Sequence, residues 1–169
     1  MKALVVYESM FGNTEKIARA VADSFGDRCD VTIAEAAAMP SAEGMDLLVV
    51  GSPTHAFGLS RPSTRQDAVR QGAAHPTDPA IGLREYLDVS PLLTGLAAAA
   101  FDTRVNMPLV PGSAAHKAHR RLRRLGCRML CPAESFRVTG TTGPLVDGEI
   151  ERARQWAARL AVTLPAGAK

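Results

Sequence analysis

Three short, uninterrupted apolar segments constrain the fold of this chain more than any other feature. They occupy residues 3–7, 46–51 and 97–101. A strand that is apolar at every position has both faces covered, as in a parallel sheet with helices on each side. Segments with helical spacing of apolar residues separate the three strands, and parallel strands need such crossovers. The alternation predicts an α/β fold: three layers around a doubly wound, five-stranded parallel sheet, in one domain spanning residues 1–169.

The other expected elements continue this alternation. A second strand is predicted at 29–34, and a last one at 127–138 with an interruption near Pro132. Helices are predicted before Gly26 and at residues 61–72, 82–89, 113–125 and 149–164.

Turns and ends are marked by glycine, proline and polar residues. The segment 72–79 is expected to be a loop, Asp147 is expected to cap the last helix, and residues 165–169 are expected to fray. Cys127 and Cys131 have an even offset within the last strand, which predicts reduced side chains on one face of the sheet.

Composition excludes several classes of protein. The apolar fraction of 46% and the charged fraction of 22% are ordinary for a globular chain. No apolar run approaches the roughly 20 residues of a membrane helix, and no signal segment is recognised, so we expect a cytoplasmic protein without a membrane span. Cys29, Cys127 and Cys131 are odd in number and lack CxxC spacing, which indicates neither a disulfide framework nor a metal site.

Residues 8–14 (ESMFGNT) connect the first apolar strand directly to a helix start. At such a position, backbone N–H groups and the positive end of the helix dipole attract an anion. Ser9 and Thr14 add hydroxyl donors. Gly12 lets the backbone approach a ligand closely, and Asn13 tolerates left-handed dihedrals. Neither GxxxxGK[ST] nor GxGxxG is present. The loop is predicted to hold a phosphate group; the alternative is an ordinary polar turn.

Two further unusual segments follow buried strands, at residues 52–58 (SPTHAFG) and 102–107 (DTRVNM). In an open α/β sheet, ligands bind beyond the carboxyl ends of the strands, where the strand order reverses. With a strand order of 2-1-3-4-5, the three segments converge on one site. The sequence therefore predicts a single ligand pocket at this edge of the sheet.

The three segments together resemble the flavin loops of the flavodoxin family. Ser9, Gly12 and Thr14 match the first-loop pattern T/S-x-T-G-x-T, with Phe11 where the family usually has threonine. GSPTHAFG is similar to the second flavin loop of flavodoxins and flavodoxin-like quinone reductases, and AAFDTR to the fourth strand and the start of the third loop. GLREYL, LRRLG and ESFRVTGTTGPLVDGEIERAR are similar to an actinobacterial-type flavodoxin subfamily. The resemblance covers nearly the whole chain and implies the order 2-1-3-4-5.

The resemblance also implies a cofactor, FMN, bound noncovalently. The implied FMN-binding residues are, by loop, Ser9, Met10, Phe11, Gly12, Asn13 and Thr14; Pro53, Thr54, His55, Ala56, Phe57 and Gly58; and Asp102, Thr103, Arg104 and Val105. The third loop lacks the tyrosine that usually stacks on the flavin ring. Val105, Asn106 and Met107 fill that place, which indicates a more open face.

Several of these residues have a second interpretation. Thr54 either touches the flavin or satisfies loop backbone, and His55 either lies at the isoalloxazine or is an exposed loop residue. Phe57 either flanks the ring or anchors the loop in the core. Asp102 either caps its loop or bonds the pyrimidine edge of the flavin, and Arg104 either donates to that edge or forms a surface ion pair.

A basic run without carboxylates extends from residue 103 to residue 133. Lys117, Arg120, Arg123 and Arg124 share the outer side of a predicted helix. They form either a solvated face or a docking surface for an acidic redox partner; aromatic interleaving typical of nucleic-acid binding is missing, so no nucleic-acid partner is expected.

The sequence leaves three functions open. The first is electron transfer through FMN to a protein partner. The second is a small FMN-dependent oxidoreductase acting on a quinone or protoporphyrinogen, and the third is an interaction module without flavin. Nothing at the site pairs a nucleophile with a base, so hydrolysis is disfavoured.

Overall fold

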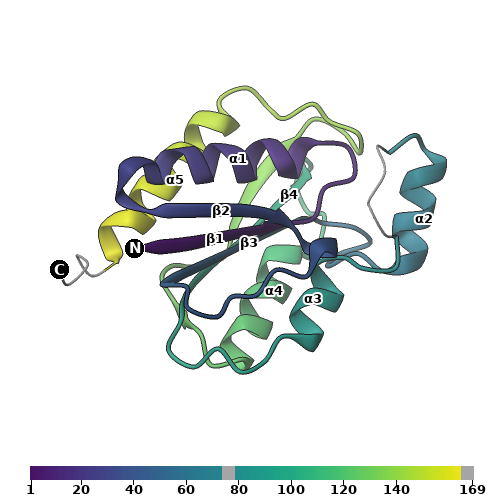
Figure 1. The fold of residues 1–169 in the computed structure, drawn as a ribbon. Helices are drawn as coiled ribbons and strands as arrows, with labels where there is room; N and C mark the ends of the chain where they lie inside the picture. Colours follow the sequence, from purple (N-terminus) through teal and green to yellow (C-terminus); the bar gives the residue numbers. More distant parts are fainter. Residues whose placement is uncertain (74–78, 165–169) are drawn as a thin grey trace.

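The structure, a computed structural model, describes residues 1–73 and 79–164. A parallel sheet forms its centre (Figure 1). Its strands are β1 (Lys2–Tyr7), β2 (Asp30–Glu35), β3 (Leu47–Pro53), β4 (Ala97–Val105), β5 (Arg128–Met129) and β6 (Glu134–Val138). The order is β2-β1-β3-β4-β5, and β6 pairs with the second half of β4. Because β5 and β6 follow one another along β4, they act as one interrupted fifth strand, which confirms the predicted order 2-1-3-4-5.

The helices lie on both faces of this sheet and beyond one end of it. They are α1 (Asn13–Phe25), α2 (Pro62–Arg70), α3 (Leu83–Val89), α4 (Ala114–Arg124) and α5 (Glu149–Thr163), with short 3-10 turns at Gly26–Arg28 and Ala36–Ala38. The pair α1 and α5 covers one face, and α3 and α4 cover the other (Figure 1). Helix α2 stands beyond the carboxyl ends of the strands. The predicted three-layer architecture is therefore confirmed.

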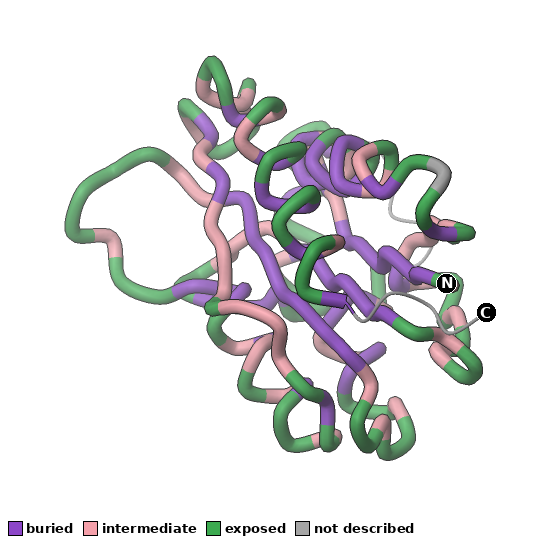
Figure 2. Tube along the Cα trace, turned by 90° about the vertical axis from the view of Figure 1, so that its left-hand side faces the viewer, coloured by how far each residue is buried: buried purple, intermediate pink, exposed green. Residues whose placement is uncertain are grey.

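Alternate side chains of the strands enter two separate cores. On β1, Val5 packs with α1 and α5, whereas Leu4 and Val6 pack with α3 and α4. Figure 2 shows the resulting continuous buried path through the middle of the molecule. Both faces of each central strand are covered, and this explains why residues 3–7, 47–51 and 97–101 carry no polar side chain other than the Tyr7 hydroxyl.

An aromatic cluster joins the sheet to α5. Phe101, Phe136 and Trp156 meet edge to face, with ring centroids 5.9 to 6.0 Å apart. Such pairs contribute about 0.5–1.5 kcal/mol each beyond the area that they bury. Gly51 faces Phe101 from the neighbouring strand, where an added Cβ would lie 2.0 Å from the ring. The glycine on β3 therefore makes room for the aromatic residue on β4.

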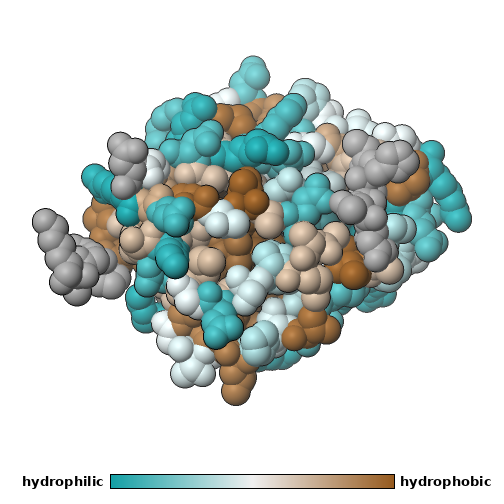
Figure 3. Space-filling view, viewed as in Figure 1, coloured by the Kyte–Doolittle hydropathy of each residue, from teal (hydrophilic) through white to brown (hydrophobic). Residues whose placement is uncertain are grey.

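Helix α1 places the first loop against the sheet. Ile17, Val21 and Phe25 are buried, while hydrophilic side chains gather on its outer side (Figure 3). Full burial of such a side chain contributes about 1.5–3 kcal/mol. The helix ends at Gly26, as predicted, with φ of 50° at that residue. Burial of this apolar side holds α1 against the sheet, and the amino end of the helix is thereby held next to the first loop.

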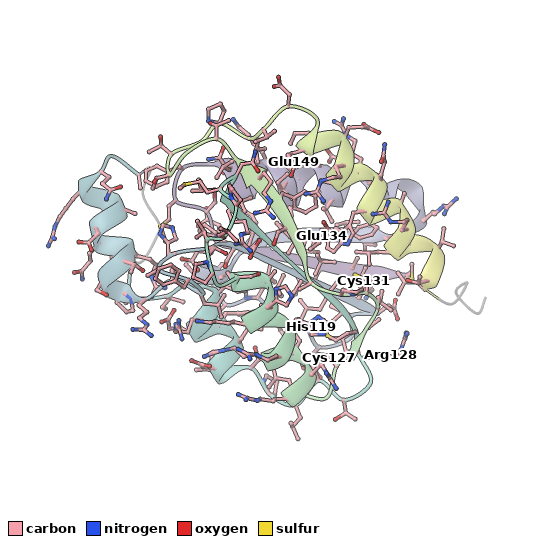
Figure 4. All side chains as sticks on the ribbon, turned by 180° about the vertical axis from the view of Figure 1, so that it is seen from behind. His119, Cys127, Arg128, Cys131, Glu134 and Glu149 are labelled. Atoms are coloured by element: carbon pink, nitrogen blue, oxygen red, sulfur yellow. The ribbon has the colours of Figure 1, made fainter. Side chains whose placement is uncertain are left out.

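Three predictions about local structure are wrong. The segment after Phe101 is not a loop, because β4 continues to Val105 between β3 and β6. Asp147 does not cap α5: the capping residue is Gly148, with φ of 86°. Cys127 and Cys131 do not share a face, since Cys127 packs toward α3 and α4 whereas Cys131 packs against the α1 and α5 side (Figure 4). The regular pairing of β5 ends at Met129, so the even offset loses its meaning.

Cys29 and Cys127 are buried, and Cys131 is partly exposed. All three are free thiols, and burial raises the pKa of Cys127 to about 11. The predicted fraying at residues 165–169 and most of the predicted loop at 72–79 lie outside the described residues.

Candidate flavin site

A cleft of about 210 Å³ lies where the first and second loops meet the end of β4. Its lining is Ser9, Met10, Phe11, Asn13, Thr14, Pro53, Thr54, His55, Ala56, Thr103, Arg104, Val105, Val138 and Thr141. Four stretches far apart in sequence meet there because β1, β3, β4 and β6 are successive neighbours in the sheet. The cleft is smaller than the roughly 300–1,000 Å³ of typical small-molecule sites, so a large ligand would extend onto its rim.

The first loop presents the amino end of α1 to this cleft. Gly12 precedes the helix with φ of 86°, and no side chain caps it. The Ser9 hydroxyl is buried without a hydrogen-bond partner in the described parts of the chain. The Thr14 and Thr103 hydroxyls bond to each other at 2.8 Å, and the Asn13 amide nitrogen donates to the Thr142 carbonyl at 3.1 Å. An unpaired buried hydroxyl is costly unless a ligand satisfies it.

The second loop is a tight turn that projects from the end of β3. His55 and Gly58 exchange two backbone hydrogen bonds of 2.9 Å, and Ala56 and Phe57 between them have φ of 41° and 71°. Left-handed dihedrals are costly for residues with a Cβ. Phe57 is 56% exposed and does not anchor the loop in the core. The turn is thus held in a strained conformation that displays an aromatic ring.

His55 lines the cleft between this turn and the first loop. Burial lowers its pKa, and the nearby positive charge of Arg65 lowers it further. The neutral imidazole is therefore favoured at neutral pH, with one ring nitrogen able to donate and the other to accept.

Asp102 organises the start of α4 and does not line the cleft. One of its carboxylate oxygens, Oδ2, accepts from the Thr54 hydroxyl at 2.8 Å, the Ser113 hydroxyl at 2.6 Å and the Ala115 N–H at 3.0 Å. The Ala114 N–H in turn donates to the Thr54 hydroxyl at 2.9 Å. A carboxylate at a helix amino end stabilises the dipole. Thr54 therefore satisfies this local network while its surface still lines the cleft.

Arg104 secures the segment that follows β4. Its guanidinium donates to the Val110 carbonyl at 2.6 Å, and within residues 1–73 and 79–164 it forms no ion pair. Among the described residues that line the cleft, no carboxylate is present, and Arg104 supplies a positive charge. With the amino end of α1 also directed here, the electrostatics favour a bound anion.

The structure brings most of the predicted residues into the lining of one cleft. Four predicted residues lie outside its lining: Gly12, Phe57, Gly58 and Asp102. Sequence reasoning missed Val138 and Thr141, which come from the end of β6 and the loop behind it. The run of small and hydroxyl residues TGTTG directly after a strand was the available signal.

A buried ionic network of Glu8, Ser60, Arg65 and Glu85 lies behind the site. Arg65 has no exposed surface; its guanidinium donates to the Ser60 hydroxyl at 2.7 Å and pairs with Glu85 at 3.0 Å. Ser60 donates to Glu8, whose other oxygen accepts the Leu83 N–H at 2.8 Å. The network ties Glu8, at the start of the first loop, to Ser60, two residues after the second. Nothing in the sequence pattern distinguished Arg65 from an exposed helix arginine.

The pKa values of the two carboxyl groups in this network shift in opposite directions. Burial raises the pKa of Glu8, because desolvation outweighs its hydrogen bonds and the attraction of Arg65. For Glu85, burial acts in the same direction, but bonds from the Gly82 N–H and Arg65 outweigh it and lower the pKa. The guanidinium is therefore paired more closely with Glu85 than with Glu8, in keeping with distances of 3.0 and 3.8 Å.

No protein-family model and no curated protein matches this chain. Solved structures do match over nearly its full length. Flavodoxin 1 of Bacillus cereus aligns with a TM-score of 0.70 and 19% identity over 98% of this chain and 100% of that one. Flavodoxin 2 of the same organism aligns with a TM-score of 0.69 and 22% identity over 96% of this chain and 99% of that one. The flavodoxin, WrbA-like protein from Agrobacterium tumefaciens aligns with a TM-score of 0.61 and 16% identity over 98% of this chain and 99% of that one.

These similarities define the class of fold. The chain has the flavodoxin-like α/β fold, and its cleft lies at the switch point where ligands bind in such sheets. No helix in the described ranges has the length and apolar character needed to cross a membrane.

Proposed function

We propose that this chain is a flavodoxin-type redox protein that binds FMN noncovalently and exchanges electrons with a protein partner. The observation that carries the proposal is the buried Ser9 hydroxyl beside the amino end of α1. It has no hydrogen-bond partner within residues 1–73 and 79–164, and no carboxylate is among the described residues that line its cleft. Such a position fits a phosphate group. Similarity in fold to flavodoxins supports a flavin as the rest of the ligand.

The first loop would hold the phosphate through the Ser9 hydroxyl, the Asn13 amide and the backbone N–H groups before α1. Pro53 to Ala56 and Thr103 to Val105 would flank the ribityl chain and the ring, and Phe57 would stand at the exposed edge. Bound FMN supplies the electron-transfer chemistry that these side chains lack. Asp102 acts indirectly, because its carboxylate fixes Thr54 and the start of α4.

A titration of the flavin-free protein with FMN and with riboflavin tests this proposal. The fluorescence of FMN should be quenched when FMN binds. Riboflavin should bind far more weakly, because it lacks the phosphate. Ser9→Ala should weaken FMN binding about tenfold, the value of one charge-assisted hydrogen bond. Ser63→Ala is the matched control, since Ser63 is exposed on α2. A colourless protein that takes up no FMN, or one that binds riboflavin equally well, contradicts the proposal.

A second function, a small FMN-dependent oxidoreductase acting on a quinone or protoporphyrinogen, is favoured by the open rim. Val105, Asn106 and Met107 would fill the place of the usual stacking tyrosine, and Met107 is 56% exposed. Steady-state oxidation of NAD(P)H with menadione distinguishes this function, because an electron carrier turns over slowly without its protein partner.

A third function, an interaction module without flavin, draws support from Phe11 and from the Thr14 hydroxyl, which already bonds to Thr103. It predicts no flavin in protein purified under mild conditions. The actinobacterial-type subfamily and a cytoplasmic location are part of our proposal; the three free thiols accord with a reducing compartment.

A further inference from the structure

Exposed apolar side chains lie on the second loop and on the segment directly after β4, and both the second loop and the end of β4 contribute to the cleft lining. We call these side chains the apolar rim: Ala56, Phe57, Met107 and Leu109. Phe57 and Met107 are each 56% exposed, and Leu109 is 99% exposed. Ala56, Phe57 and Leu109 also have φ of 41°, 71° and 67°, in the left-handed region that disfavours side chains. Strained backbone that displays apolar groups to solvent does not stabilise this chain by itself.

The two segments that carry the apolar rim, residues 55–58 and 107–112, pack against one another. Gly112, with φ of 86°, packs so closely on the 55–58 turn that an added Cβ would lie 2.2 Å from the Phe57 carbonyl oxygen. Arg104 bonds to Val110 and fixes the same segment from below. The apolar rim is therefore carried by two segments that pack on one another, and exposed apolar patches mark contact surfaces.

A basic face on α4 adjoins this patch. It consists of Lys117, Arg120, Arg123 and Arg124. Lys117 reaches the second loop, since a Cβ on Gly58 would lie 2.4 Å from its ammonium nitrogen. Within residues 1–73 and 79–164, none of the four forms an ion pair. Nitrogen-tipped side chains extend from this side of the molecule in Figure 4.

Helix stability does not account for the whole basic face. Arg123 and Arg124 are in the last turn of α4, where cations favour the helix dipole. Lys117 is in the first turn, where the dipole disfavours a cation. Its ammonium therefore has an unfavourable position for the helix and a favourable one for an acidic molecule at the rim.

The positive charge continues beside the second loop. Arg84 donates to the carbonyls of Leu59 and Ser60 at 2.6 and 2.9 Å. Burial lowers its pKa, and the charges of Arg121 and Arg61 lower it further. Like charges thus crowd this side of the molecule, with Asp88 neutralising Arg121 at its margin.

We infer that the apolar rim and the basic face together form one docking surface for a protein whose own contact face is rich in carboxylates around an apolar centre. An apolar centre with a charged border is typical of protein interfaces, and opposite charge raises the rate of encounter. The inference rests on the proposed function in that such a partner would bring its redox centre to the mouth of the cleft.

Binding of a plant-type [2Fe–2S] ferredoxin, an acidic protein, tests the inference, with a basic cytochrome c as the opposite probe. Titration calorimetry should detect binding of ferredoxin, and no binding of cytochrome c, by both the FMN-loaded and the flavin-free chain. Raising the ionic strength from about 0.01 M to about 0.1 M shortens the Debye length from about 30 to about 10 Å and should weaken the complex strongly.

Two variants and their controls locate the surface. Lys117→Glu with Arg120→Glu should weaken ferredoxin binding at least about tenfold, whereas Arg154→Glu with Arg159→Glu on α5 changes net charge equally and should have little effect. Leu109→Ser should weaken ferredoxin binding about threefold. Leu92→Ser is the control and should leave ferredoxin binding unchanged, because Leu92 is also exposed but lies outside the apolar rim.

The outcomes separate this inference from the proposed function. A chain that takes up no FMN but shows the predicted ferredoxin binding contradicts the proposed function and supports the docking surface. Absence of ferredoxin binding at low ionic strength, or equal losses in the α4 and α5 variants, overturns the docking surface. So does tighter binding of a DNA duplex that is lost in the same α4 variant, because the face would then be a site for polyanions.

Discussion

Replacement of Arg65 by methionine tests the buried ionic network behind the cleft. Methionine retains much of the aliphatic stem but removes every donor of the guanidinium. The side chain donates to the carbonyls of Pro79 and Ala80 at 2.7 and 2.9 Å, to Ser60 at 2.7 Å, and pairs with Glu85 at 3.0 Å. Because Arg65 has no exposed surface, water cannot replace it in the intact fold.

The expected loss is about 3–5 kcal/mol of unfolding free energy, the usual effect of removing one partner from a buried ion pair. Glu8 remains buried without its nearby cation, and that penalty dominates the loss. A typical domain has only about 5–15 kcal/mol in total. The pKa of Glu8 is already raised by burial, and loss of Arg65 raises it further. Protonation then removes the penalty, so the variant should approach the wild type as pH falls toward 4.5 and below.

Urea unfolding followed by Trp156 fluorescence and circular dichroism gives the free energies. Arg70→Met on the same helix is the control, because the Arg70 side chain is 76% exposed and its loss should change stability by less than about 0.5 kcal/mol. Glu8→Gln combined with Arg65→Met should recover part of the loss. A loss below about 1 kcal/mol for Arg65→Met, or one independent of pH, would refute the reasoning.

Two further predictions concern stability. Gly51→Ala should lower the unfolding free energy by about 1–3 kcal/mol, because the added Cβ would lie 2.0 Å from the Phe101 ring. Gly140→Ala is the control and should not lower it, because nothing lies within 4 Å of the added Cβ. Equal urea midpoints for the two variants would contradict this prediction. Burial acts to raise the pKa of Glu149, but hydrogen bonds from Arg152 and the Arg137 N–H outweigh burial and leave the pKa below 4.5. The ionised Glu149 therefore stabilises the fold above pH 4.5, and this stabilisation is lost as the pH falls through the pKa of Glu149 in the folded protein. Glu149→Gln should therefore unfold about 1–2 kcal/mol more easily at pH 7, with a difference that narrows in acid; a constant difference in thermal unfolding across pH 3–7 would count against the assignment.

Much of the fold could be predicted because its signals are local. Continuous apolar strands such as residues 46–51 and amphipathic helices such as α1 are read from spacing alone. Predictions were wrong where pairing with strands distant in sequence decides the local structure. For example, β4 continues through Asp102 and Thr103 because β3 and β6 flank it. An interrupted strand likewise placed Cys127 and Cys131 on different sides.

The site divides in the same way. The sequence placed segments 8–14, 52–58 and 102–107 at the carboxyl ends of β1, β3 and β4, and with the strand order that the resemblance implied, this position predicted a shared site. Only the tertiary structure decided that Asp102 holds α4, that Thr141 reaches the cleft and that Arg65 is buried between Glu8 and Glu85. Side-chain bonds between residues distant in sequence depend on how the elements pack, and no local pattern encodes that packing.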